Sequence, residues 1–222
     1  MFDLAPEAAA LGLCGACLVF EDLTNAQRAE GFERYKADLW GRLTARYAPA
    51  TLVENPVLAG FRDLHDKVGR SNRKFPASTE RMLGVFLKYG SIAPINLAVD
   101  IYNCVSLESL LSLGAHDIDK LRGNISLLLT DGSERFTPLG KEREERVPAG
   151  EYAYVEEGGE VLCRLECRQA ERTKVMMESR HCFYMIQGNG NTEAEYIMAA
   201  VDKLVELTKK YCGGVERMLW SG

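Results

Sequence analysis

The sequence predicts an α+β protein in which helices lie on an antiparallel or mixed sheet. Helix-period patterns occupy most of the first half of the 222-residue chain, and short β-rich runs with turn signals between them occupy residues 125–187. A last helical pattern follows these runs. The strand–helix alternation that builds parallel βαβ units does not occur, which favours helices laid on a sheet. We therefore interpret residues 1–222 as a single domain.

Composition supports an ordinary globular protein. Hydrophobic residues make up 46% of the chain and charged residues 27%, and there are only 7 prolines. A chain of this length buries roughly 70% of its surface on folding, which is enough for a real core. The apolar runs are shorter than the ~18 residues of a membrane span, and the Ala-rich amino terminus lacks a basic leader. We expect a cytoplasmic protein without a membrane partner.

The first elements follow from local patterns. The apolar run at residues 11–20 predicts a buried strand. Apolar residues at spacings of three and four predict a helix from Asn25, its expected N-cap, to Tyr47. Asn55 and Pro56 predict the start of the next helix, which Gly69 ends. A third helix is expected to end near Gly90.

The later elements change period. Residues 95–107 predict a short, mostly buried helix on which Asn96, Asp100 and Asn103 share one face. The runs ISLLLT, RFTPL, EYAYV, EVLCRLEC and HCFYMIQ predict strands. The last helix is expected to begin at a capping box formed by Thr192 and Glu195 and to end at Gly213.

The 7 cysteines do not predict a cofactor or a metal. Cys14 and Cys17 have a metal-ligand spacing, and Cys163 with Cys167 could complete a zinc site, but both pairs lie in predicted strands. We interpret them as buried free thiols. His65 falls on the apolar side of its helix, where a hydrogen-bonded core histidine is the more frequent finding.

Two segments carry most of the polar chemistry. Residues 89–125 combine the polar helix face with a predicted loop that holds His116 and Asp117. Residues 167–179 place a dense charge cluster after a predicted strand. This cluster either binds a ligand or forms a solvated, salt-bridged turn.

The same segments resemble a known family. APINLAVDIYN from Ala93 and GAHDIDKLRGNI from Gly114 are similar to motifs of the editing (B3/B4) domain of the phenylalanyl-tRNA synthetase β subunit. CRQAERTKV and FPASTERML are similar to segments of free-standing relatives of that domain. The resemblance covers roughly residues 60–190. It implies a three-layer β/β/α fold, in agreement with the order of elements predicted above.

The resemblance also implies a function. The synthetase domain accepts the mis-attached tyrosyl end of a tRNA and hydrolyses the ester, so the expected partner is the 3′ end of a tRNA or aminoacyl-tRNA, with an amino acid as a further ligand. Tyr102 stands where the family has threonine, and Gly114 where it has histidine. The first change fills a pocket and the second enlarges it. Candidate substrate-binding residues are Asn96, Asp100, Tyr102, Asn103, Gly114, His116, Asp117, Arg168 and Thr173.

Two further sets complete the predicted site. Glu171, Arg172 and Glu178 are the candidate catalytic residues, which would orient water or hold the ester. The candidate RNA-binding residues are Lys67, Arg70, Arg73, Lys74, Arg81 and Lys174. Because the net charge is −5, RNA binding has to come from such a local basic patch.

Two functions remain open at this point. The chain either hydrolyses mischarged aminoacyl-tRNA in trans, or it binds RNA, an amino acid or a protein on the same scaffold without catalysis. The segment that resembles the editing domain occupies most of the 222 residues and leaves no room for an aminoacylation core, so ligase activity is not expected.

Overall fold

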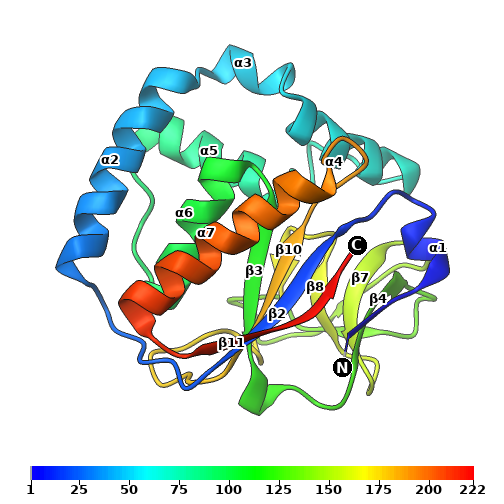
Figure 1. Ribbon diagram of the computed structural model, residues 1–222. Coiled ribbons are helices and arrows are strands. Elements are labelled where there is room, and N and C mark those ends of the chain that lie inside the picture. Colours follow the sequence, from blue (N-terminus) through cyan, green and yellow to red (C-terminus); the bar gives the residue numbers. More distant parts are fainter. Residues whose placement is uncertain (1) are drawn as a thin grey trace.

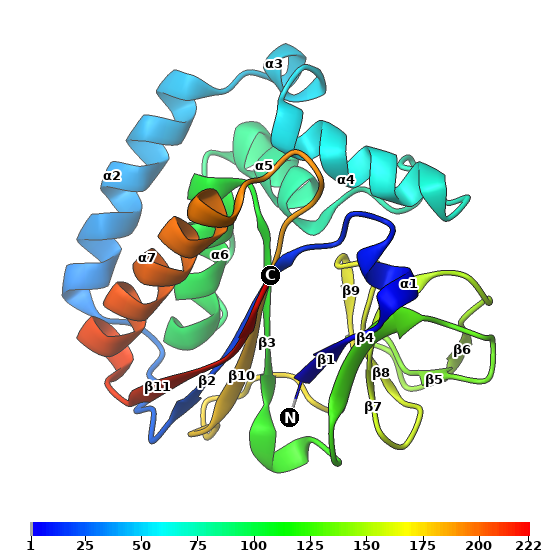
Figure 2. The same ribbon diagram turned by 45° about the vertical axis from the view of Figure 1, so that its right-hand side comes forward.

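The fold has three layers, as expected, and a four-stranded sheet lies in the middle. The computed structural model describes residues 2–222. The middle sheet has the strand order β11-β2-β10-β3, with helices on one face and a five-stranded sheet on the other (Figure 2). Its strands are β2 (Gly15–Glu21), β3 (Ser112–Asp117), β10 (Cys182–Gln187) and β11 (Val215–Ser221).

The register of the middle sheet decides which side chains face the second sheet. β10 is antiparallel to both β2 and β3, with Met185 opposite Gly114 and Gln187 opposite Ser112. Since side chains alternate along a strand and directly paired residues share a face, these four residues lie on the same side of the sheet. That side faces the five-stranded sheet.

The five-stranded sheet has the order β1-β4-β7-β8-β9. β1 runs parallel to β4, and the other pairs are antiparallel. A separate two-stranded sheet joins β5 to β6. The strands are β1 (Phe2–Leu4), β4 (Ile125–Leu129), β5 (Arg135–Phe136), β6 (Glu145–Arg146), β7 (Tyr152–Glu156), β8 (Val161–Arg164) and β9 (Arg168–Gln169).

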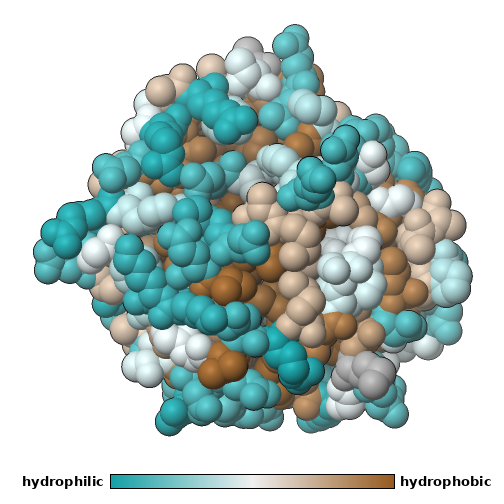
Figure 3. Space-filling model, viewed as in Figure 1, coloured by the Kyte–Doolittle hydropathy of each residue, from teal (hydrophilic) through white to brown (hydrophobic). Residues whose placement is uncertain are grey.

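Helices α6 and α7 cover the outer face of the middle sheet, with α2 outside them (Figure 1). The face viewed in Figure 3 is mostly hydrophilic over α2, as expected for the outside of an amphipathic layer. The helices are α1 (Pro6–Ala9), α2 (Glu30–Arg46), α3 (Pro49–Val53), α4 (Pro56–Lys67), α5 (Ser78–Tyr89), α6 (Leu97–Ser109), the 3₁₀ turn η1 (Ile118–Lys120) and α7 (Ala194–Cys212).

Two predicted helix boundaries are confirmed. The Asn55 side chain accepts hydrogen bonds from the backbone N–H groups of Val57 and Leu58, so it caps α4 as expected. Gly90 ends α5 in the left-handed conformation, with φ at 73°.

Two other predicted caps are wrong. Asn25 does not begin α2, which starts five residues later. The side-chain oxygen of Asn25 instead accepts a hydrogen bond from the backbone N–H of Ala98, in the first turn of α6. The Thr192 hydroxyl bonds the carbonyl of Asn189 rather than capping α7. In both cases, a tertiary or loop hydrogen bond competes with the local cap.

His116 and Asp117 lie on a strand and not on the predicted loop. This segment was expected to be a loop, but Ser112–Asp117 forms β3. Strands β1 and β11 were not predicted either. Among residues 2–222, no helix is long and apolar enough to cross a membrane.

Candidate functional site

The turn between β8 and β9 is held by a buried cluster of ionisable groups. Leu165 and Glu166 adopt left-handed φ angles of 50° and 45°. The Glu166 carboxylate lies 3.1 Å from Nε2 of His65 through each of its oxygens, and it also accepts the hydroxyl of Tyr152. All three side chains are buried. The cluster fixes the turn, whose strained backbone needs such support.

Burial and pairing shift the pKa values of Glu166 and His65 in this cluster. Burial raises the pKa of Glu166, and the neighbouring His65 offsets only part of the rise. Burial alone would lower the pKa of His65, but the Glu166 carboxylate, together with hydrogen bonds to Asn72 and to the Leu165 backbone, outweighs burial and leaves the His65 pKa raised. His65 and Glu166 therefore each change the pKa of the other.

Beside this turn lies the largest cavity of the site, which we call the outer groove. Its volume is about 680 Å³. It lies between the starts of α5 and α6 and the segments around β9. Its walls are Ser78, Arg81, Met82, Ile95, Tyr102, Asn103, Leu113, Pro138, Leu139, Lys141, Glu145, Glu166, Cys167, Arg168 and Gln169.

A second cavity, the side recess, shares four of these walls. Its volume is about 310 Å³, and its shared residues are Ile95, Tyr102, Leu139 and Gln169. The remaining walls are Asn96, Val99, Lys174, Val175, Met176 and Met177. Three apolar side chains at its mouth are exposed: Ile95 by 55%, Leu139 by 51% and Met177 by 43%. Exposed apolar groups gathered around a cavity are typical of a ligand site.

A third, much smaller cavity lies between the two sheets. This inner chamber has a volume of about 10 Å³, close to that of a single water molecule. Its walls are Ser112, Leu113, Gly114, Tyr154, Cys163, Glu166, Gln169, Met185 and Gln187. Gln169 thus lines all three cavities.

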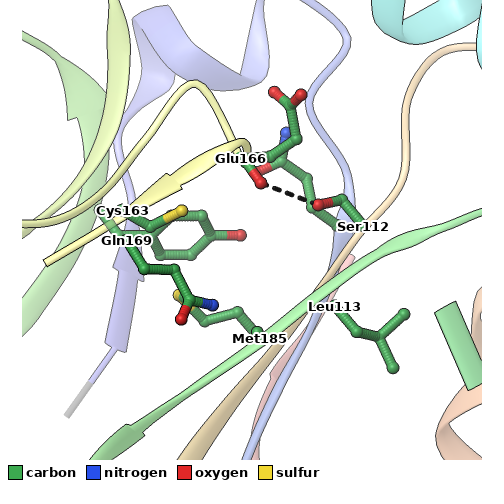
Figure 4. A pocket seen from close by; sticks show the side chains of 9 residues that line it. Ser112, Leu113, Cys163, Glu166, Gln169 and Met185 are labelled. Carbon is green, nitrogen blue, oxygen red and sulfur yellow. Dashed lines mark hydrogen bonds between the residues drawn. The ribbon is translucent and has the colours of Figure 1, made fainter. Parts of the chain in front are cut away.

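The Gln169 side chain occupies the space in front of Gly114. A Cβ atom added at Gly114 would lie 2.2 Å from Nε2 of Gln169. Figure 4 shows this side chain reaching between the sheets next to Met185. The Glu166 carboxylate points away from the chamber, and the Glu166 backbone carbonyl accepts a 3.0 Å hydrogen bond from Ser112 (Figure 4). Gln169 therefore separates the inner chamber from the outer groove.

Gln187 is the most unusual polar group of the chamber. Its side chain is 1% exposed, and neither its amide nitrogen nor its amide oxygen has a hydrogen-bond partner among the described residues. Leaving a buried amide unpaired is costly, so native proteins seldom do it without a reason.

Basic side chains dominate the rim of the outer groove. Arg168 lies 4.8 Å from the ring centre of Phe75 and 3.3 Å from a carboxylate oxygen of Glu145. Within residues 2–222, neither Arg81 nor Lys141 makes an ion pair, and both are exposed. These cations can approach a polyanion at little desolvation cost.

The comparisons with known proteins agree with this architecture. The B3/4 domain family matches residues 66–213. This chain belongs to the B3/4 domain family. A crystal structure of an N-terminal fragment of the phenylalanyl-tRNA synthetase β subunit from Pyrococcus horikoshii superposes with a TM-score of 0.53 at 14% identity. The superposition covers 98% of this chain and 50% of that fragment. A comparison with curated proteins gives no match.

Several of the predicted residues of this B3/4 domain meet at the cavities. Tyr102 lines both the groove and the recess and packs edge-on against Tyr184, with ring centres 6.4 Å apart. Asn96 lines the recess while its side chain also caps α6. The predicted residues that line a cavity are Arg81, Asn96, Tyr102, Asn103, Gly114, Arg168 and Lys174.

Other predicted substrate-binding residues line none of these three cavities. Asp100 accepts the N–H of Ile95 at 2.9 Å and pairs with Lys36, which orders the start of α6. His116 bonds the Thr173 hydroxyl at 2.7 Å. Burial, with a smaller contribution from the Arg172 charge, lowers the pKa of His116 to about 3. Asp117 accepts the hydroxyl of Ser179 at 2.6 Å. These contacts give each side chain a structural role.

The candidate catalytic residues lie apart from one another. Arg172 donates to Glu156, Glu160 and the carbonyl of Lys120. Glu171 pairs with Lys174 and accepts the N–H of Gly140 at 2.8 Å, and these two contacts lower its pKa. Glu178 is exposed in the segment between β9 and β10. The structure does not bring the three residues to one point.

The predicted RNA-binding residues are also divided. Lys67 donates to the carbonyl of Leu11 at 2.7 Å, and Arg70 pairs with the buried Glu151. Arg73 and Lys74 are exposed in the segment that leads to Phe75, beside the groove. Of the six residues, only Arg81 lines the groove and only Lys174 lines the recess.

Apart from Gly114, sequence reasoning missed the residues of the inner chamber that this section describes. Gln169 stands beside Arg168 in the CRQAERT motif, so the resemblance offered a signal for it. Gln187 offered only a weak signal, as a polar residue at the end of an apolar strand. Ser112 and Glu166 gave none, because β3 and the β8–β9 turn were not recognised.

The cysteines lie in several separate elements of the fold. All 7 cysteines are free, and burial raises the pKa of each of them. Among residues 2–222, no group of three or more His, Cys, Asp or Glu side chains is placed to hold a metal ion.

Proposed function

We propose that this B3/4 domain binds the 3′ acceptor end of a tRNA in the outer groove. The observation that carries the proposal is the combination, on one surface, of a cationic rim with an adjoining apolar recess. The fold is that of a fragment of a tRNA synthetase subunit, which makes tRNA the first nucleic acid to test.

The charges of the groove suit a phosphate backbone. Arg81 and Lys141 are exposed, and Arg168 is held by Phe75 in a defined position. Since the chain as a whole is acidic, binding depends on this local patch and is expected to weaken steeply with salt.

The recess suits the terminal nucleoside or its aminoacyl group. Ile95, Leu139 and Met177 offer exposed apolar surface on which a base can pack. Tyr102 connects this surface to the groove, so a single ligand can contact both.

Hydrolysis of the bound ester has less support than binding. A general base has to reach a water molecule beside the substrate. The two carboxylates of the groove are already engaged, Glu145 by Arg168 and Glu166 by His65 and Tyr152. We therefore propose binding as the primary function and treat deacylation as a separate measurement.

Fluorescence anisotropy with labelled tRNA tests the proposal. We expect intact tRNA to bind more tightly than the same tRNA without its 3′-terminal CCA. The double variant Arg81→Gln/Lys141→Gln is expected to bind about tenfold more weakly at low salt. A parallel incubation with aminoacyl-tRNA is expected to show no turnover, and multiple turnover would establish the hydrolase instead.

A matched control separates the local patch from overall charge. Arg34→Gln/Lys203→Gln makes the same change in net charge on exposed side chains of α2 and α7, away from the groove. This control is expected to bind as the wild type does. Equal weakening in both double variants, or indifference to the CCA end, would contradict the proposal.

A further inference from the structure

The inner chamber holds a polar group that the fold itself does not use. Gln187 is buried with both amide atoms unpartnered among the described residues, and it lines the same chamber as Gln169. An amide in this state can satisfy a ligand that offers a hydrogen-bond donor and an acceptor side by side.

The entrance is closed by a side chain that can move. Gln169 fills the space over Gly114, and the other side chain close to that space is Met185, whose Cε lies 3.2 Å from the position of an added Cβ. The obstruction is the far end of a flexible side chain, so a rotamer change would join the inner chamber to the groove. The space released has the size of a carboxamide with one methylene.

The lining of the enlarged chamber disfavours a charged ligand. Arginine, lysine and histidine are all missing from its lining among the described residues, and its one carboxylate, Glu166, turns away to His65. A buried ion would lack a counter-charge there. The polar groups of the lining are neutral: the amides of Gln169 and Gln187, the hydroxyls of Ser112 and Tyr154, the Cys163 thiol and the Glu166 carbonyl, which already accepts the Ser112 hydroxyl.

We infer that the inner chamber accepts a small neutral side chain that ends in a carboxamide. Gln169 closes the entrance to the chamber, and Gln187 forms the hydrogen bonds that recognise the carboxamide. This inference rests on the proposed function, since the side chain would belong to the aminoacyl group of the bound acceptor end. Gln169 leaves its place over Gly114 and the ligand carboxamide takes it, pairing with Gln187.

Three near-isosteric probes test the inference. They are 3′-amino-3′-deoxyadenosine carrying asparaginyl, leucyl or aspartyl groups in amide linkage, with binding measured by calorimetry. The asparaginyl probe is expected to bind at least about tenfold more tightly than the other two, because a site built for hydrogen bonds rejects analogues that leave them unpaired. Similar binding of all three probes would overturn the inference.

Variants connect the selectivity to the two glutamines. Gln187→Met conserves volume, and it is expected to bring the asparaginyl-to-leucyl ratio close to one. Thr208→Val is the matched control, because the Thr208 hydroxyl is also buried and unpartnered but lies on α7. Gln169→Ala is expected to strengthen asparaginyl binding, since no gate then has to be displaced. An unchanged ratio in Gln187→Met, or weaker binding in Gln169→Ala, would contradict the assignment.

Free amino-acid amides separate this inference from the proposed function. N-acetyl-asparagine methylamide and its leucine counterpart lack the adenosine. If they show the selectivity while the adenosine probes do not bind, the chamber is confirmed and the acceptor-end proposal fails. If neither set shows selectivity, the chamber inference is wrong, whatever tRNA does.

Discussion

Nε2 of His65, on α4, lies 3.1 Å from both carboxylate oxygens of Glu166, a residue distant in sequence at the β8–β9 turn. Nδ1 of the same ring lies 3.0 Å from the side-chain oxygen of Asn72. One buried imidazole therefore joins a helix, a loop and the turn that contributes Glu166 and Cys167 to the walls of the groove. The relationship makes the shape of the groove depend on a core contact.

Removing this imidazole is expected to destabilise the fold strongly. His65→Leu leaves the Glu166 carboxylate buried with only Tyr152 as a partner, and uncompensated buried charges cost about 3 kcal/mol or more. Urea unfolding measures the loss. The exposed Arg34–Glu30 pair provides the comparison, and Arg34→Ala is expected to cost less than about 0.5 kcal/mol. Equal losses in the two variants would mean that the cluster is not structural.

Stability in mild acid is expected to depend on His116. Its native pKa of about 3 lies below the unfolded value of about 6.5, so the native state binds fewer protons. The stabilisation is present above pH ~6.5 and is lost as the pH falls towards 3, with a slope of up to about 1.4 kcal/mol per pH unit. His116→Gln is expected to flatten this slope between about pH 6.5 and 5. His65→Gln is not, because the His65 pKa is raised and its stabilisation is lost on the alkaline side.

Substitution by alanine is expected to destabilise the protein much less at Gly114 than at Gly15. In Gly114→Ala the new Cβ meets the end of the Gln169 side chain, which can move, so the cost is expected to be about 1 kcal/mol. In Gly15→Ala the Cβ meets the backbone oxygen of Ile186 at 2.2 Å, and the cost is expected to exceed about 3 kcal/mol. Thermal unfolding of both variants checks the order. Adding Gln169→Ala is expected to rescue the first variant.

The number of phosphate contacts is open to measurement through salt. If Arg81 and Lys141 each contact one phosphate of a single-stranded acceptor end, the slope of log K against log salt falls by about 0.7 for each charge removed. Titrations at several salt concentrations give this slope for each single variant. Parallel lines for wild type and variants would place the RNA elsewhere.

Replacing Gln187 is expected to stabilise the protein. Gln187→Met removes an unpartnered buried amide, whose burial costs about 1 to 3 kcal/mol, and conserves the volume. The free energy of unfolding is expected to rise by about 1 kcal/mol. A loss of stability would show that the amide makes a structural hydrogen bond, and would weaken its assignment to a ligand.

Local signals were sufficient for part of the fold. Asn55 with Pro56 and Gly90 mark helix ends by side-chain capping and by left-handed backbone, which depend on few neighbours. Asn25 was wrongly predicted to cap α2, because its side chain bonds the N–H of Ala98 on another helix. β3 was missed because glycine, histidine and aspartate interrupt the apolar pattern of a strand that is buried throughout.

The site was less predictable than the fold. Tyr102, Gly114 and Arg168 were found through their motif, and all three line a cavity. The resemblance suggested that glycine enlarges the pocket at position 114, but the pairing of Gly114 with Gln169 emerges only when the two sheets pack together. Arg172 was predicted because it is a charged residue of the motif, but two of its acceptors, Glu156 and Glu160, lie in segments that the quoted motifs do not contain.

The placement of β11 has a consequence for how the chain folds. β11 pairs with β2, so the strand nearest one end of the described chain completes a sheet begun near the other. Closing such long sequence separations is slow, and the middle layer has to wait for it. During synthesis, the edge of β2 that pairs with β11 therefore remains open until residue 221 has left the ribosome, and an open strand edge in that period is exposed to aggregation.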